Sequence, residues 1–508
     1  MSFPATLQLL LAPLDAAAPA LGAPGTRPLS FGGLRTQIAE TLDALNKVGI
    51  GRGDRVAIVL PNGPEMAATF LAVASCAASA PLNPAYRAEE FEFYLTDLGA
   101  KALIVQKDVE TPAIAVAEKL NVPMLRLTPR REDGAGRFSL DISGMPAAKP
   151  SMGGYAEPDD VALVLHTSGT TSRPKIVPLR QRNVCASAHN IRTTTRFEPA
   201  DVGLNIMPLF HIHGLIAGVT APLSAGSSVF CTPGFNALKF FGWMEECKAS
   251  WYTAVPTMHQ GILLRAGHHK DLIERQPLRF LRSSSASLPP QVLADLEAAF
   301  GAPVIEAYGM TEAAHQMACN PLPPLKRKPG TVGLPAGPEV AIMDDKGALL
   351  KHGQVGEIVI RGANVTDGYE SNPKANAEAF TDGWFRTGDQ GVMDDEGYIS
   401  VTGRLKEIIN RGGEKISPRE VDEVLMDHPA VQQVVTFGIP HDKLGEEVGA
   451  CVVLREGMDS SERDLRDFAA GRLADFKVPK KILFLPEIPK GATGKLQRIG
   501  LAQKLGLG

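Results

Sequence analysis

Residues 161–175 read Val161-Ala162-Leu163-Val164-Leu165-His166-Thr167-Ser168-Gly169-Thr170-Thr171-Ser172-Arg173-Pro174-Lys175. The first five are apolar and predict a short buried strand. The rest form a glycine- and hydroxyl-rich loop, which offers backbone N–H groups, hydroxyls and one ammonium to a polyanion such as a nucleotide triphosphate. The Walker A spacing is absent, because no Gly-Lys-Ser/Thr follows the first glycine. Because the loop directly follows a strand, an anion-binding site is favoured over the alternative, a polar surface loop.

The same rhythm continues on the N-terminal side of this stretch. Residues 55–60 and 102–105 are apolar and predict two further strands, and a helical pattern runs from about residue 65 to 76. Alternating strands and helices indicate α/β layers with mainly parallel sheets.

The last hundred residues have a different pattern. Helices are expected at 418–427 and 462–473, and strands at 431–435 and 449–454, which together are typical of a compact α+β domain. A glycine beside charged residues at Thr402-Gly403 is suited to a hinge. We therefore expect a large domain over residues 1–402 and a small, mobile one over residues 403–508.

The composition is that of an ordinary globular protein. The chain has 508 residues, 44% hydrophobic and 21% charged, and its net charge of -4 argues against a general nucleic-acid binder. No segment is apolar for long enough to span a bilayer. Six scattered cysteines contain no C-x-x-C pair, so neither zinc nor disulfides are indicated. Free thiols, and the lack of a basic stretch before the apolar N-terminus, predict a cytoplasmic protein.

Several clusters of polar residues follow along the chain. They are His211-Ile212-His213, Glu306-Ala307-Tyr308-Gly309-Met310-Thr311-Glu312, Thr387-Gly388-Asp389, Gly403-Arg404-Leu405-Lys406-Glu407, Asn410-Arg411-Gly412-Gly413-Glu414-Lys415 and Pro489-Lys490-Gly491-Ala492-Thr493-Gly494-Lys495. In this order, and together with the loop after residue 166, they resemble the adenylate-forming superfamily, which includes acyl-CoA synthetases. The resemblance covers nearly the whole chain.

The resemblance implies a reaction in two halves. A carboxylate attacks the α-phosphorus of ATP to give an acyl adenylate and pyrophosphate, and the thiol of coenzyme A then displaces AMP. Charge neutralisation matters more than covalent help in such a step. The residues implied to bind ATP are Thr167, Ser168, Gly169, Thr170, Thr171, Lys175, Glu306, Ala307, Tyr308, Thr311, Asp389, Arg404 and Lys415.

The resemblance also implies individual roles. Asp389 would accept the ribose hydroxyls, Arg404 would brace the same ribose, and Glu312 would bind Mg²⁺ through oxygen. A turn cap for Asp389 and a solvated surface position for Arg404 are the alternatives. Tyr308 is interpreted as a wall for adenine rather than as a reacting group.

Catalysis is assigned by resemblance to Lys495, Thr311 and His211. The Lys495 ammonium would stabilise charge that develops between the carboxylate and the α-phosphate. Lys406 matches the hinge position, and its rotation would bring Gly412 and Gly413 toward the thiol channel.

The acid is predicted from a third group of residues. The hydroxyl-rich run at residues 283–287 suits a small acid with a second polar or charged end, because a buried carboxylate needs donors. With Ser285, His211 and His315 as substrate contacts, the chain looks most like the oxalate–CoA ligases. Malonate, 4-coumarate-like and medium-chain acids are the alternatives, as is an inactive nucleotide-binding regulator. The implied partners are a small carboxylate, ATP and CoA, for a monomer or homodimer.

Overall fold

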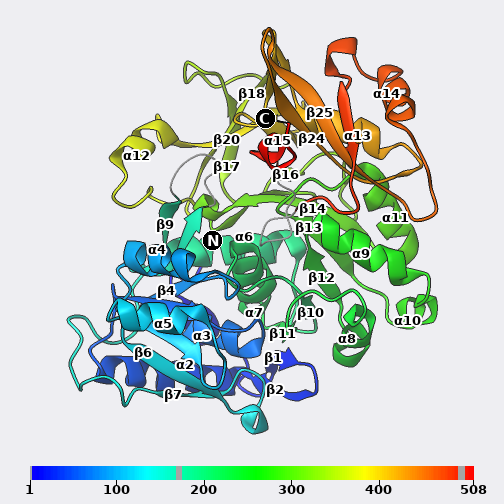
Figure 1. Ribbon diagram of the computed structural model, residues 1–508. Helices are drawn as coiled ribbons and strands as arrows, with labels where there is room; N and C mark the ends of the chain where they lie inside the picture. The colour runs from blue at the N-terminus through cyan, green and yellow to red at the C-terminus, as the bar shows by residue number, and fades with distance from the viewer. Residues whose placement is uncertain (1–2, 168–173, 490–497, 508) are drawn as a thin grey trace.

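The computed structural model describes residues 3–167, 174–489 and 498–507. The described residues form four sheets, which follow one another along the chain except that the first two strands, at residues 19–30, join the nine-stranded sheet (Figure 1). The blue and cyan part of the chain carries a seven-stranded sheet, and the green part carries most of a nine-stranded one. The orange and red C-terminal part lies at one end of the molecule, over helices α9 (Pro256–Ala266) and α11 (Pro290–Phe300).

The seven-stranded sheet contains the strand that the opening stretch predicts. In spatial order its strands are β7 (Phe138–Asp141), β6 (Met124–Pro129), β5 (Ala102–Gln106), β3 (Arg55–Val59), β4 (Ala78–Pro81), β8 (Val161–Thr167) and β9 (Lys175–Arg180). Neighbours from β6 to β8 are parallel, whereas β7 and β9 run antiparallel at the two edges. The helices of this half are α2 (Phe31–Lys47), α3 (Pro64–Ala74), α4 (Ala88–Leu98) and α5 (Pro112–Lys119). The expected strands at 55–60, 102–105 and 161–165 are confirmed.

The nine-stranded sheet positions the candidate site. Its order is β16 (Leu334–Pro335), β15 (His315–Cys319), β14 (Val304–Met310), β13 (Phe280–Ser284), β12 (Trp251–Ala254), β10 (Val202–Asn205), β11 (Ser228–Cys231), β1 (Pro19–Ala23) and β2 (Thr26–Ser30). The pairs between β14 and β1 in this order are parallel, whereas β16, β15 and β2 at the two edges pair antiparallel. Its other helices are α1 (Leu7–Leu11), α6 (Gln181–Thr195), α7 (Ala221–Ser224), α8 (Phe240–Cys247) and α10 (Lys270–Arg275), and a π-helical segment, η2, covers His213–Thr220.

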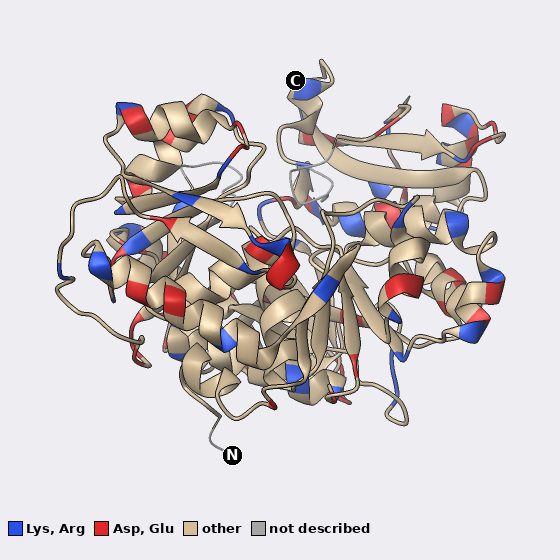
Figure 2. Cartoon of the chain, turned by 90° about the horizontal axis from the view of Figure 1, so that it is seen from below, with Lys and Arg blue, Asp and Glu red and all other residues tan. Residues whose placement is uncertain are grey.

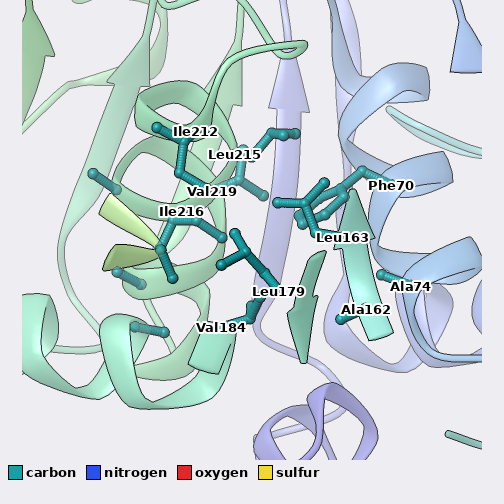
Figure 3. Close-up of a cluster of buried hydrophobic side chains, with 14 of the residues drawn as sticks. Phe70, Ala74, Ala162, Leu163, Leu179, Val184, Ile212, Leu215, Ile216 and Val219 are labelled. Atoms are coloured by element: carbon teal, nitrogen blue, oxygen red, sulfur yellow. The ribbon is translucent and has the colours of Figure 1, made fainter. Parts of the chain in front are cut away.

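The main core lies between these two sheets. It is built from fully buried apolar side chains of α3, β8, α6 and η2. They include Phe70, Leu163, Val184, Leu215 and Ile216 (Figure 3). Each such side chain contributes roughly 1.5–3 kcal/mol by leaving water. The core therefore holds the segments on either side of the predicted phosphate loop, β8 and β9, against the sheet that carries the rest of the site.

The third sheet is antiparallel throughout. It consists of β17 (Glu339–Met343), β18 (Val355–Arg361), β20 (Trp384–Met393), β19 (Phe380–Thr381) and β21 (Ile399–Arg404), with helix α12 (Pro373–Ala379) before β19. Helix α12 lies in the connection between β18 and β19, and the strand pairs of this sheet are antiparallel. The mainly parallel arrangement thus holds for the two larger sheets.

The fourth sheet belongs to the C-terminal α+β unit. Its strands are β22 (Ile409–Arg411), β23 (Glu414–Ile416), β24 (Val431–His441), β25 (Gly445–Leu454) and β26 (Lys481–Phe484), with helices α13 (Pro418–Met426), α14 (Glu462–Ala470) and α15 (Leu501–Lys504). The unit has its own apolar core. The four elements expected from the sequence are confirmed, and the predicted boundary at 402/403 falls inside β21.

Charges of both signs are mixed over the outer helices and loops rather than gathered by sign (Figure 2). Among the residues that the structure describes, no helix is both long and apolar enough to cross a membrane.

Candidate active site

A cleft of about 350 Å³ lies at the carboxyl ends of β13 and β14, where the third and fourth sheets meet the nine-stranded sheet. Ligands commonly bind at this edge of parallel sheets. Residues that line it include Ser285, Tyr308, Asp389, Arg404, Asp422 and Arg498. It therefore draws side chains from both sides of the predicted domain boundary.

Three side chains form the nucleotide end of the cleft. Tyr308 Oη donates to Asp389 Oδ2 at 2.5 Å, and Arg404 Nε donates to Asp389 Oδ1 at 3.3 Å. Asp389 and Arg404 are direct partners in the β20–β21 pairing. Burial, followed by the Asp389 charge, raises the pKa of the Tyr308 phenol well above its usual value, so this hydroxyl remains a donor. The carboxylate of Asp389 bonds to side chains on β14 and β21, which is not the arrangement of a turn cap.

Glu312 lies in the short turn of helix, η3 (Thr311–Ala313), that follows β14. Its Oε1 accepts a hydrogen bond from Tyr369 Oη at 2.7 Å, and Lys175 Nζ lies 4.1 Å from the centre of the Tyr369 ring. Burial raises the pKa of Glu312, while Tyr369 and Lys175 oppose that rise. Tyr369 thus brings Lys175, at the end of the predicted phosphate loop, beside the predicted Mg²⁺ ligand. One carboxylate together with phosphate oxygens is a set of ligands that suits Mg²⁺.

A buried polar cluster lies behind Ser285, which lines the cleft. His213 Nδ1 lies 3.0 Å from Ser285 Oγ, and His213 and His315 stack with ring centres 4.9 Å apart. Arg282 contacts both rings, at 3.4 Å from His213 Nε2 and 3.2 Å from His315 Nε2. His211 Nδ1 accepts the His213 backbone N–H at 3.3 Å, which places the third histidine beside the cluster.

The other predicted residues lie as follows. Thr167 ends β8, Lys175 begins β9, Ala307 lines the cleft and Thr311 begins η3. Glu306 is buried beneath the cleft surface: it is 3% exposed and its Oε1 accepts the Leu288 N–H at 3.1 Å. Burial raises the pKa of Glu306 to about 7. Ser168, Gly169, Thr170, Thr171 and Lys495 lie outside the described residues.

The predicted hinge and thiol-channel residues lie near the start of the C-terminal unit. Lys406 is in the turn that follows β21. Gly412 and Gly413 form the turn between β22 and β23 with φ angles of 60° and 101°, which glycine adopts without strain. Lys415, on β23, is exposed.

Sequence reasoning missed Arg282 and Tyr369. Arg282 directly follows the apolar pair Phe280-Leu281, and a charged residue in a buried strand is a usable signal. Tyr369 carries no such signal, because its role depends on contacts with Glu312 and Lys175 that are distant in sequence.

Comparison with known proteins agrees with this arrangement. The model of the AMP-binding enzyme family matches residues 13–370, and that of the AMP-binding enzyme C-terminal domain matches residues 420–495. The chain is 48% identical to an oxalate–CoA ligase of Arabidopsis thaliana, over 90% of each chain. It is 43% identical to an oxalate–CoA ligase of Saccharomyces cerevisiae, over 89% of this chain and 87% of that one.

Among solved structures, ATP-bound MatB from Rhodopseudomonas palustris superposes with a TM-score of 0.89 at 30% identity, over 98% of each chain. The family match spans well over half of the chain and includes β14, which carries Tyr308. The chain belongs to the AMP-binding enzyme family of adenylate-forming proteins.

Proposed function

We propose that the protein is an ATP-dependent ligase that joins oxalate to coenzyme A through an oxalyl adenylate, with release of AMP and pyrophosphate. The observation that carries the choice of acid is a polar wall at Ser285, with His213, His315 and Arg282 buried behind it. An apolar lining would suit an aryl or fatty acid, whereas this wall offers donors to a second carboxylate. Two relatives of 43–48% identity act on oxalate by name, which supports the same choice.

In the first half-reaction, Asp389 holds the ribose by its acceptor oxygens while Tyr308 and Arg404 hold Asp389 in place. Lys175 and Glu312 lie together at the phosphate end through Tyr369. Mg²⁺, when bound at Glu312, would neutralise phosphate charge. Lys495 and the loop residues 168–171 keep their predicted roles as catalytic lysine and phosphate cradle.

In the second half-reaction, rotation about Lys406 would carry the Gly412-Gly413 turn toward the adenylate, as the sequence predicts. Its positive φ angles allow backbone to approach a narrow thiol channel closely. The cytoplasmic location and the monomeric or homodimeric state remain predictions.

The test is pyrophosphate exchange with oxalate, malonate, 4-coumarate and octanoate, followed by a thioester assay with CoA. We expect exchange and thioester with oxalate in clear excess over the other three. Preference for 4-coumarate or octanoate would contradict the choice of a small diacid. Preference for malonate would contradict oxalate and make malonate the substrate. No exchange with any acid would favour a nucleotide-binding regulator.

Control variants separate binding from chemistry. Lys495→Ala should bind ATP but abolish exchange, because the charge that develops at the α-phosphate loses its partner. His315→Ala should raise the KM for oxalate far more than the KM for ATP. An unchanged oxalate KM would remove His315 from the acid site.

A further inference from the structure

Arg282 is a buried arginine that pairs with no carboxylate among the described residues. It lies on β13, and its side chain is fully buried. Its guanidinium contacts only neutral partners: two imidazoles, the Gln316 Oε1 at 3.2 Å and the Thr253 Oγ1 at 3.5 Å. Its Nε is buried with no hydrogen-bond partner in this part of the chain.

This guanidinium is charged at neutral pH. Burial lowers the pKa of Arg282, but only to about 10. A buried cation without a counter-ion is unfavourable, so proteins rarely keep one that nothing balances. We expect the missing anion to come from a ligand in the cleft at Ser285, which His213 connects to Arg282.

The contacts of Arg282 dictate where the two histidines hold their protons. A guanidinium has N–H donors and no acceptor, so each Nε2 that faces it must present a lone pair. Both rings are then neutral and carry their proton on Nδ1. The Thr253 hydroxyl, 2.6 Å from His213 Nε2, fits the same state as a second donor to that nitrogen.

In this state both rings have their N–H donor at Nδ1. With this tautomer, His213 Nδ1 is the donor to Ser285 Oγ, which leaves the Ser285 hydroxyl hydrogen free for an acceptor in the cleft that Ser285 lines. His315 Nδ1 lies against Gly309, another lining residue: a Cβ at that glycine would stand 3.1 Å from the nitrogen. The wall therefore presents donors, as an anion requires.

Backbone strain is concentrated at the same place. Ser285, Ala314 and His315 all have positive φ angles, of 74°, 46° and 101°, although none is glycine. Such conformations are unfavourable and persist where the surrounding structure holds functional groups in place. The positions of Ser285 and His315 are thus imposed by the fold.

We propose that Arg282 is a positioning residue for acid specificity: it locks His213 and His315 as Nδ1–H tautomers and places a buried positive charge behind them, so that the wall selects acids with a second negative group. This inference rests on the proposed function, because it assumes that the acid binds at Ser285. Arg282 acts through the histidines and needs no contact with the acid itself.

The first test needs no substrate. Long-range ¹H–¹⁵N spectra of the full-length protein labelled with ¹⁵N-histidine report which ring nitrogen carries the proton, and loss of signals in His213→Gln and His315→Gln assigns the two rings. We expect both rings neutral with the proton on Nδ1. A proton on Nε2 of either ring would overturn the proposal, whatever the acid proves to be.

The second test compares three variants. Arg282→Met keeps bulk but removes charge and donors, and Arg282→Lys keeps the charge. Arg279→Met is the matched control, since Arg279 precedes the same strand but pairs with Asp201 at 2.7 Å. The kinetic parameters are measured for oxalate, for propionate as a monocarboxylate, and for ATP, and thermal melting checks that each variant is folded.

We expect Arg282→Met to raise the oxalate KM roughly tenfold or more, with the propionate and ATP KM values little changed. Arg282→Lys should recover part of the oxalate preference, and Arg279→Met should leave it unchanged. An equal loss for oxalate and propionate would make Arg282 merely structural and overturn the proposal. Should Arg282→Met not fold, the tautomer spectra and Arg282→Lys still decide.

Failure of the proposed function looks different. If oxalate is not the substrate, the acid panel shows another preference while the tautomers stay as inferred. If the proposal itself is wrong, oxalate remains the preferred acid and the tautomers differ.

Discussion

Tyr308 on β14 donates its hydroxyl hydrogen to Asp389 on β20, and the two oxygens lie 2.5 Å apart. The bond joins the nine-stranded sheet to the antiparallel third sheet across 81 positions of sequence. The sequence predicts that Tyr308 forms a wall for adenine. The structure adds that its hydroxyl orients Asp389, the residue predicted to hold the ribose.

Tyr308→Phe keeps the ring and removes this donor. We expect the KM for ATP to rise roughly tenfold, because a hydrogen bond to a charged group contributes about 1.5–3 kcal/mol, while kcat changes little. Steady-state kinetics with varied ATP measure it. Tyr398→Phe is the matched control, since its hydroxyl bonds the Lys326 carbonyl instead. Equal effects of the two variants would mean that Tyr308 has no special part in ATP binding.

Glu312→Gln tests the predicted metal ligand. The amide keeps the shape and can still accept from Tyr369, but it lacks the charge that Mg²⁺ prefers. We expect a higher Mg²⁺ concentration for half-maximal pyrophosphate exchange and a large fall in rate at saturating Mg²⁺. Glu378→Gln, on the exposed side of α12, should leave the Mg²⁺ titration as it is. An unchanged titration in Glu312→Gln would move the metal site elsewhere.

Glu306 predicts a pH-dependent stability. Burial raises its pKa from 4.5 to about 7, so the folded protein favours the protonated carboxyl. The stability that this proton contributes is full below pH 4.5 and is lost as the pH rises through about 7. The Glu306→Gln side chain stays neutral. Between pH 4.5 and about 7 the free energy of unfolding of this variant should therefore rise relative to the wild type, by at most ~3 kcal/mol.

Unfolding of the two proteins by urea at a series of pH values measures this gain. Glu274→Gln, an exposed carboxylate on α10, should show none. A constant difference between Glu306→Gln and the wild type across the window would contradict a raised pKa.

Lys406→Pro tests the hinge. Proline fixes φ in the turn after β21, so rotation of the C-terminal unit should be restricted while its present position is kept. We expect thioester synthesis to fall much more than pyrophosphate exchange. Lys406→Ala removes the side chain but leaves φ free and should affect neither strongly. Equal loss of both half-reactions in Lys406→Pro would count against a hinge here.

Local pattern was enough for much of the fold. The apolar run before residue 166 predicted β8, and the spacing of apolar residues after Pro418 predicted α13, because such elements bury one face or run through a core. The antiparallel third sheet was not predicted, since its strand partners are set by contacts that period and composition do not encode.

For the site, the sequence by itself determined which side chains are present: the hydroxyl-rich loop, Asp389, Glu312 and the histidines, in an order that resembles one superfamily. Only the tertiary structure decided which of them meet. It turned Glu306 into the protein and placed Arg282 between two histidines that are 102 positions apart. The physical reason is that hydrogen-bond direction and the loss of water around a charge depend on neighbours in space, and the folding of β12 to β15 side by side creates those neighbours.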